Sequence, residues 1–218
     1  MEETKWKDLY SSHIQNEFKS FDEYFRIKMK LKKPFLKCIL KYAKDKPILE
    51  CGCGTGKFSV YLATLGLDVY AIDLEKEMIQ MTNELSNSKS ANNLVKVSVA
   101  DARSIPFEDN KFSVTHSSGV LEHYSDEDIV ALINEQLRVS DYCIFSVPTK
   151  YFDKKMFGNE RFMTRKEWRE IILKSNAKII KEAGYHYKTL KNRLVDIIKS
   201  PKKIFKPIAL YVFVLTKK

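Results

Sequence analysis

The stretch PILECGCGTGKFSVYLATLG, Pro47 to Gly66, decides the fold, because it joins a short apolar segment to a helical one through three closely spaced glycines. The segment PILECG is typical of a strand buried in a parallel sheet. The segment KFSVYLATLG has apolar side chains at helical spacing and stops at a glycine. Glycines at positions 52, 54 and 56 allow the main chain to approach a ligand closely. The stretch therefore predicts a ligand-binding turn between a strand and a helix.

The order of residues in this turn excludes several common ligands of glycine-rich loops. A P-loop requires Gly-Lys followed by Ser or Thr, whereas Gly56-Lys57 is followed by an aromatic residue. A dinucleotide fingerprint requires a glycine where Lys57 stands. A zinc site needs about four ligands, and Cys51 and Cys53 have no second pair of Cys or His downstream. We expect no metal, and instead a bulky ligand with a positive group near Glu50.

Strand and helix patterns alternate on both sides of this stretch, which predicts right-handed crossovers and a mostly parallel sheet. The fold class expected is α/β, a doubly wound, Rossmann-like sheet of seven strands with the last strand antiparallel. Ser125 followed three residues later by Asp128 indicates a helix start. The predicted strands are residues 47–52, 67–74, 95–101, 111–119, 141–148, 177–187 and 209–218, and the predicted helices within the core are residues 57–66, 75–86, 125–140 and 163–175.

Length and composition favour one globular domain in the cytoplasm. The chain has 218 residues, of which 44% are hydrophobic, which is enough for one α/β core. No apolar run approaches the ~18 to 20 residues of a membrane span. The charged start MEETKWKDLY has no apolar segment typical of a secretory signal. Four scattered cysteines are too few for a disulfide scaffold and are expected to be reduced.

The net charge of +10 is concentrated in one C-terminal segment. Residues 188–218 hold nine Lys or Arg and one Asp, whereas the other 187 residues hold 29 basic and 27 acidic groups. We divide the chain into an N-terminal helical lid, residues 1–45, and a core, residues 46–218, with a basic amphipathic insert at about 188–207. The insert is interpreted as a solvated surface helix, with a membrane-surface element or an RNA contact as alternatives.

At this point several motifs together resemble class I S-adenosylmethionine-dependent methyltransferases. LECGCGTG is similar to the first motif of that class, commonly written Glu/Asp-x-Gly-x-Gly-x-Gly, and YAIDLEKEMI resembles the second. VADARSIPFEDNKFSVTHSSGVLEH resembles the third and fourth motifs. The resemblance covers about residues 47–148. It implies the fold expected above, S-adenosylmethionine as cofactor and methyl transfer as the activity.

The resemblance also implies which residues bind the cofactor. Asp73, at the end of the second strand, would accept hydrogen bonds from the ribose hydroxyls, and Asp101 would accept from the adenine amino group beside the main chain of Ala102. Leu74, with Met78 and Ile105, would supply the apolar adenine pocket. Ser118 and the glycine after it would line the methionine arm. The remaining predicted contacts come from the first motif: Glu50, Gly52, Gly54 and Gly56.

The methyl acceptor is the least determined part of the prediction. The Asn/Asp-Pro-Pro-aromatic motif of adenine and glutamine methylation is missing after the fourth strand, and no cysteine has the Pro-Cys context of cytosine C5 methylation. We therefore expect a small molecule with a nitrogen or oxygen nucleophile. His123 is the candidate catalytic base; the alternative is a packing role.

Two other functions stay open. RNA or protein methylation would use the basic insert, although the nearly neutral core does not favour nucleic acid. A cofactor-binding module without turnover is the second alternative. The aromatic residues of the N-terminal lid, which include Trp6, Tyr10, Phe21 and Tyr24, are interpreted as cover for the sheet and as a candidate wall of the acceptor site.

Overall fold

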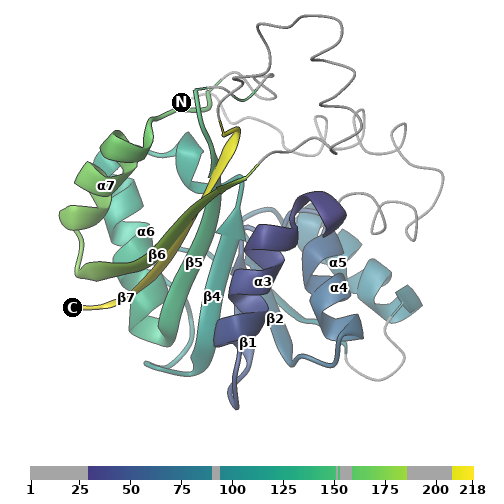
Figure 1. Cartoon of the computed structure of the whole chain (residues 1–218). Coiled ribbons are helices and arrows are strands. Elements are labelled where there is room, and N and C mark those ends of the chain that lie inside the picture. Colours follow the sequence, from purple (N-terminus) through teal and green to yellow (C-terminus); the bar gives the residue numbers. More distant parts are fainter. Residues whose placement is uncertain (1–28, 90–93, 151, 153–158, 186–207) are drawn as a thin grey trace, which may run out of the picture.

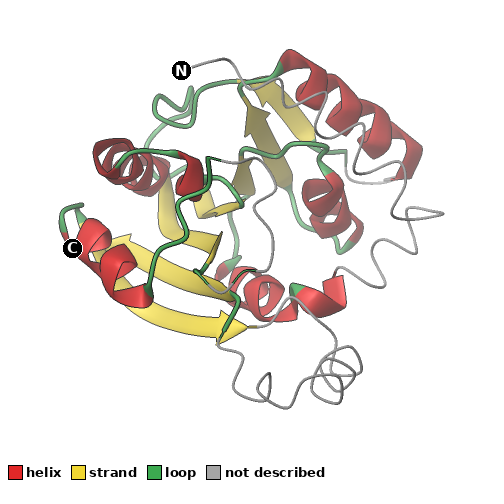
Figure 2. Ribbon diagram, turned by 90° about the horizontal axis from the view of Figure 1, so that it is seen from above, coloured by secondary structure: helices red, strands yellow, loops and turns green. Residues whose placement is uncertain are grey.

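The computed structural model describes residues 29–89, 94–150, 152, 159–185 and 208–218. These form one seven-stranded sheet with helices on both faces (Figures 1 and 2). The strands are β1 (Ile48–Cys51), β2 (Val69–Asp73), β3 (Lys96–Val99), β4 (Phe112–Ser118), β5 (Ser140–Pro148), β6 (Ala177–Tyr185) and β7 (Leu210–Lys217). The helices are α3 (Lys33–Tyr42), α4 (Lys57–Thr64), α5 (Lys76–Lys89), the 3₁₀ turn η1 (Leu121–His123), α6 (Asp126–Val139) and α7 (Arg165–Leu173).

The strand order β3-β2-β1-β4-β5-β7-β6 is that of a doubly wound sheet. All neighbouring strands run parallel except those paired with β7, which is antiparallel to β5 and β6. The predicted fold class, including the antiparallel last strand, is therefore confirmed. The strand order reverses between β1 and β4, and ligands of such sheets bind outside the carboxyl ends of the strands at this point.

Each face of the sheet packs against its own set of helices (Figure 1). On one face α3, α4 and α5 bury a cluster that includes Phe35, Ile39, Val60, Leu62, Val114 and Val214. On the other face α6 and α7 bury a cluster that includes Leu132, Ile133, Phe145, Trp168 and Phe213. Burial of apolar side chains on both faces explains why β1 reads as a continuous apolar run rather than an alternating one.

The helix starts follow the capping signals in the sequence. The hydroxyl of Ser125 accepts a hydrogen bond from the main-chain amide of Asp128 at 3.2 Å, as expected at the start of α6. A complete capping box begins α7, where Thr164 and Glu167 exchange both hydrogen bonds. These caps fix the loops that enter both helices.

A compact loop joins β3 to β4, and Arg138 of α6 holds it. Its guanidinium donates to the main-chain oxygens of Ile105 at 2.8 Å and Phe107 at 3.0 Å. It also forms an ion pair of 2.6 Å with Asp109. This anchor fixes the chain that follows Asp101.

Two predictions concern segments that lie outside the described residues. The aromatic part of the N-terminal lid falls in residues 1–28, and the basic insert falls in residues 186–207. Within the lid, residues 33–42 are helical as expected. None of the helices in the described part of the chain is both long and apolar enough to cross a membrane.

Candidate cofactor site

The glycine turn lies at the carboxyl end of β1, at the point where the strand order reverses. Its three glycines all have left-handed φ angles: +71° at Gly52, +52° at Gly54 and +66° at Gly56. A Cβ on Gly52 would lie 2.7 Å from a methyl carbon of Val120, and a Cβ on Gly56 would lie 2.2 Å from one of Thr82. These positions require glycine both for conformation and for space.

Glu50 is the third of the four buried residues of β1 and is 5% exposed. It pairs across the sheet with Ala71 on one side and His116 on the other. Its Oε2 accepts a hydrogen bond from the hydroxyl of Ser59 in α4. Burial raises the pKa of Glu50 to about 7, against the smaller lowering effects of Ser59 and Lys32. A cation placed beside Glu50 would favour its ionised form.

Asp73 at the end of β2 is tied to the glycine turn. Its Oδ2 accepts from the amide of Gly54 at 2.8 Å and its Oδ1 from the amide of Glu75 at 3.0 Å. Burial raises the pKa of Asp73, and the two amides act in the opposite direction. An ionised carboxylate has about four acceptor positions, so the ribose hydroxyls predicted to bind here still find lone pairs.

The adenine side of the predicted site is more open. Leu74 is 51% exposed and offers apolar surface next to Asp73, whereas Met78 and Ile105 are buried in the core. Asp101 follows β3 and accepts from the guanidinium of Arg103, which holds its pKa below the usual value.

The two other residues predicted to contact the cofactor lie at opposite ends of the site. Ala102 is partly buried against the apolar clusters under the β3–β4 loop. Ser118 is the last residue of β4, and its Oγ accepts from Nζ of Lys32 at 3.2 Å. Asp73 on β2, Glu50 on β1 and Ser118 on β4 therefore lie along one edge of the sheet, in this order.

The turn after β4 holds the candidate base. His123 is partly buried, and its Nδ1 lies 2.8 Å from Oδ1 of Asn159. Because an amide oxygen only accepts, this bond places the proton on Nδ1 and makes Nε2 the basic nitrogen. Burial lowers the pKa of His123, so the ring is neutral at physiological pH.

Two residues of this edge were assigned no role in the sequence analysis. Lys32, immediately before α3, reaches Ser118, and nothing in the sequence around it distinguishes it from the other lysines of the segment. Glu122, beside His123, is 3% exposed, and within the described part of the chain its Oε2 has no hydrogen-bond partner. An acid directly after the non-polar residues 119–121 is unusual, and this pattern was the signal that could have indicated a functional role for Glu122.

The four cysteines and the acids do not form a metal centre in the described residues. No group of three or more His, Cys, Asp or Glu side chains there is arranged to hold an ion. Cys51 and Cys53 are buried, and burial raises the pKa of both thiols well above the usual value. Both thiols are therefore protonated, and we interpret Cys51 and Cys53 as small buried side chains at the turn.

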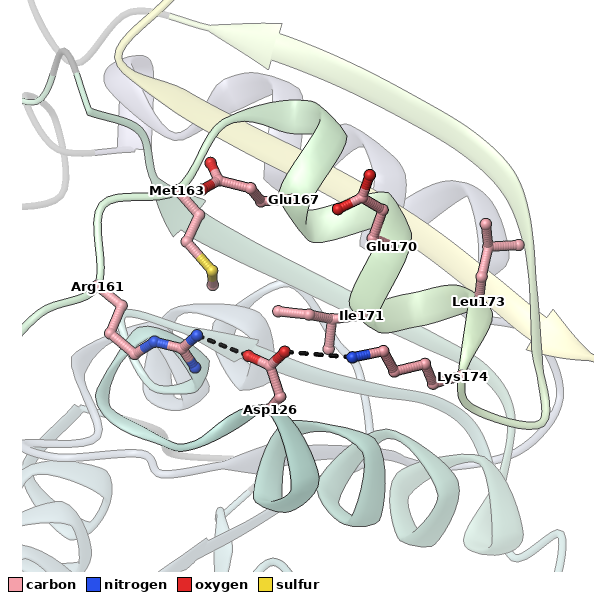
Figure 3. A pocket seen from close by; sticks show the side chains of 8 residues that line it. All are labelled: Asp126, Arg161, Met163, Glu167, Glu170, Ile171, Leu173 and Lys174. Carbon is pink, nitrogen blue, oxygen red and sulfur yellow. Dashed lines mark hydrogen bonds and ion pairs between the residues drawn. The ribbon is translucent and has the colours of Figure 1, made fainter.

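A hollow of about 510 Å³ lies between α6 and α7, away from the glycine turn (Figure 3). At its base Asp126 accepts from Arg161 at 2.6 Å and from Lys174 at 3.4 Å. Arg161 also donates from its main chain to the carbonyl of Glu122 at 2.8 Å and from its guanidinium to that of Tyr124 at 2.7 Å. These bonds fasten the segment that carries Asn159 to the turn that carries His123. None of the predicted site residues lines this hollow.

Comparison with known proteins finds methyltransferases that are similar to part of this chain. Residues 48–141 match the family described as "Methyltransferase domain". The chain is 34% identical over 98 residues to tocopherol O-methyltransferase of Arabidopsis thaliana, covering 44% of this chain and 28% of that protein. It is 28% identical over 158 residues to a ribosomal-protein methyltransferase of Campylobacter fetus, covering 66% and 53%. The chain thus spans about a quarter to half the length of these relatives.

A solved structure agrees over nearly the whole chain. Magnesium protoporphyrin IX methyltransferase of Synechocystis, crystallised with bound S-adenosylmethionine, superposes with a TM-score of 0.66 at 14% identity, covering 98% of this chain and 89% of that one. The sheet thus has the class I methyltransferase fold. Residues 48–141 match a methyltransferase domain, and the cofactor of this class is S-adenosylmethionine. The resemblance found in the sequence is confirmed.

The residues at this edge fit that cofactor chemically. S-adenosylmethionine carries an ammonium and two ribose hydroxyls, and the edge offers the carboxyls of Glu50 and Asp73 from neighbouring strands. The turn between them has no Cβ at positions 52, 54 and 56, so its main chain can lie close to a bulky ligand. The partnerless Oε2 of Glu122 is a further polar group that a ligand would satisfy.

Proposed function

We propose that this protein transfers a methyl group from S-adenosylmethionine to a nitrogen or oxygen nucleophile of a small molecule, giving S-adenosylhomocysteine. The observation that carries the proposal is the glycine turn at the switch point of the sheet, with the buried Glu50 and the amide-bound Asp73 on either side of it. The match of residues 48–141 to a methyltransferase domain supports the same reaction.

The proposed chemistry asks little of the protein beyond positioning and removal of a proton. The cofactor supplies an electrophilic methyl carbon, and the acceptor's lone pair forms the new bond while the carbon–sulfur bond electrons pass to sulfur. Glu50 would hold the methionine ammonium, and Asp73 the ribose, so that the methyl group faces the acceptor. His123 would take the acceptor's proton on Nε2, since Asn159 fixes the other ring proton.

A small-molecule acceptor is favoured over a macromolecule by charge. Outside residues 188–218 the chain carries 29 basic and 27 acidic groups, so the core offers little net attraction for a nucleic-acid backbone. The relatives named above are described as acting on tocopherol and on a ribosomal protein, so both acceptor types occur among them. The four free cysteines suit a reducing compartment, and the cytoplasm stays the proposed location.

The test is release of S-adenosylhomocysteine by purified protein supplied with S-adenosylmethionine. Separate reactions receive pools of small amines, phenols or carboxylic acids, and another receives total RNA. Turnover with one small-molecule pool is the expected result. Turnover only with RNA, lost when Lys202 and Lys203 are replaced by Ala, would instead establish the macromolecular alternative. Cofactor binding without turnover in any pool would favour a non-catalytic module.

A further inference from the structure

Lys32 and Glu122 belong to two different segments, and each lies beside a residue at the end of β4. Nζ of Lys32 lies 3.2 Å from Oγ of Ser118 and 5.4 Å from the ring centre of Phe58. Oε1 of Glu122 lies 3.7 Å from the position that a Cβ on Gly119 would take. Because Ser118 and Gly119 are consecutive, both contacts are made at the same end of β4. Lys32 also acts electrostatically on Glu122 and opposes the rise of its pKa, so the ammonium and the carboxyl group lie in the same region of the sheet edge.

Glu122 is held at this point without its full set of hydrogen bonds. The side chain is buried, and its Oε2 has no hydrogen-bond partner among the described residues. A buried carboxyl oxygen left without a partner is costly and rare in folded proteins. A ligand group beside Glu122 would remove this cost, which makes the partnerless atom an independent sign of a binding site.

The protonation of these groups favours an anionic ligand. Burial raises the pKa of Glu122 to about 8, and Glu160 acts in the same direction while Lys32 opposes it. At neutral pH the carboxyl group is therefore mostly an O–H donor. His116, which lies behind the site in β4, stays neutral because burial lowers its pKa to about 3. An ammonium, a hydroxyl and a neutral acid are all donors, and together they match a carboxylate oxygen.

We propose that Lys32, Ser118 and Glu122 form a carboxylate-binding site at the methyl-transfer end of the cofactor site. The inference rests on the proposed function, because the methionine arm of the cofactor is expected to end beside Ser118. Two sources supply a carboxylate there: an acidic group on the methyl acceptor, and the α-carboxylate of the methionine arm. The first source narrows the substrate class to acidic small molecules.

The first arm of the test asks whether the carboxylate belongs to the cofactor. Calorimetry compares S-adenosylmethionine with its decarboxylated form, on the wild-type chain, Lys32→Met and Lys32→Arg. If the cofactor is the source, Lys32→Met weakens binding of S-adenosylmethionine about tenfold and leaves the decarboxylated form unchanged. Lys32→Arg keeps the charge and retains most of the affinity. Lys37→Met, which changes an exposed lysine of the adjoining helix α3, is the matched control.

The second arm asks whether the carboxylate belongs to the acceptor. The protein saturated with S-adenosylhomocysteine is titrated with benzoate, benzamide and benzamidine, which share one shape and differ in charge. If the acceptor is the source, benzoate binds about tenfold more tightly than the other two, and only Lys32→Met removes this preference. When Lys32→Met behaves as Lys37→Met does in both arms, the proposal is overturned.

The role of Glu122 is tested by the pH dependence of carboxylate binding, measured with whichever ligand loses affinity in Lys32→Met. Affinity of the wild type for the carboxylate should fall between about pH 7 and 9, as Glu122 ionises and repels the ligand. Glu122→Gln keeps a donor that does not ionise, so its affinity should stay level across this range. A parallel fall in both proteins would exclude Glu122.

Absence of cofactor binding in the wild type would contradict the proposed function, whereas benzoate titration of the protein alone would still decide the carboxylate site.

Discussion

The amide of Gly54 donates a hydrogen bond of 2.8 Å to Oδ2 of Asp73, although the two residues belong to different strand–turn units. This bond fixes the glycine turn of β1 to the end of β2 before any ligand is present. The amide of Glu75 holds the other carboxylate oxygen at 3.0 Å. Asp73 is therefore oriented by the main chain, and a ribose would bind to a group that is already in place.

The first prediction concerns Asp73 itself. Asp73→Ala should weaken S-adenosylmethionine binding by about 1–3 kcal/mol, the scale of hydrogen bonds to a charged group. Isothermal titration calorimetry measures the loss. Asp68→Ala, which removes an exposed acid paired with Lys96 just before β2, should leave the affinity unchanged. Equal affinities of Asp73→Ala and the wild type would remove Asp73 from the site.

The second prediction separates backbone strain from steric overlap in the glycine turn. Gly56→Ala should destabilise the fold by about 2–5 kcal/mol, because its φ is +66° and its new Cβ would lie 2.2 Å from Thr82. Gly66→Ala has a φ of +89° but open space around the Cβ, so it should cost only about 1–2 kcal/mol. Urea denaturation of both variants measures the difference. Equal losses would contradict the steric part of the argument.

The third prediction tests His123 as the base. Since burial lowers its pKa below the usual 6.5, kcat should rise with pH through a step below 6.5 and be level near neutrality. His123→Gln should lower kcat by about 10²–10⁴-fold and remove this step. Asn159→Ala, which removes the partner of Nδ1, should give a smaller loss with the step retained. A His123→Gln rate within a few-fold of wild type would show that another group or water takes the proton.

The sequence was sufficient to predict all seven strands and the antiparallel direction of the last. Strand and helix patterns are local, and burial on both faces gives β5 a mostly apolar sequence that is read directly. The positions of Glu50 and Asp73 at one edge also followed, because carboxyl ends of parallel strands share an edge.

Contacts between residues far apart in the chain could not be predicted from the sequence. Lys32 touches Ser118, 86 residues away, and only the packing of α3 on the sheet decides which lysine of that segment does so. The pairing of His123 with Asn159 likewise depends on Arg161, which fastens one loop to the other. Such contacts carry no periodicity and no spacing rule, so they come from the three-dimensional arrangement alone.

The fourth prediction is that Glu50→Gln increases the stability of the fold and weakens cofactor binding. Burial raises its pKa from 4.5 to about 7, so between these values the folded protein binds more protons than the unfolded chain. The contribution of Glu50 to the free energy of unfolding is therefore complete below pH 4.5 and is lost as pH rises through 7. Glu50→Gln cannot ionise, so relative to wild type it should gain up to about 3 kcal/mol between pH 5 and 8.

Binding should change in the opposite direction, because the amide of Glu50→Gln has no charge for the methionine ammonium. Urea denaturation at pH 5 and pH 8 gives the stability difference, and calorimetry at pH 8 gives the affinity. Comparison with the wild type at each pH cancels the contribution of Glu122, which titrates in the same direction. If Glu50→Gln is no more stable than the wild type at pH 8, burial does not destabilise the ionised form of Glu50. A variant that gained stability yet bound S-adenosylmethionine normally would show that the buried acid does not contact the cofactor.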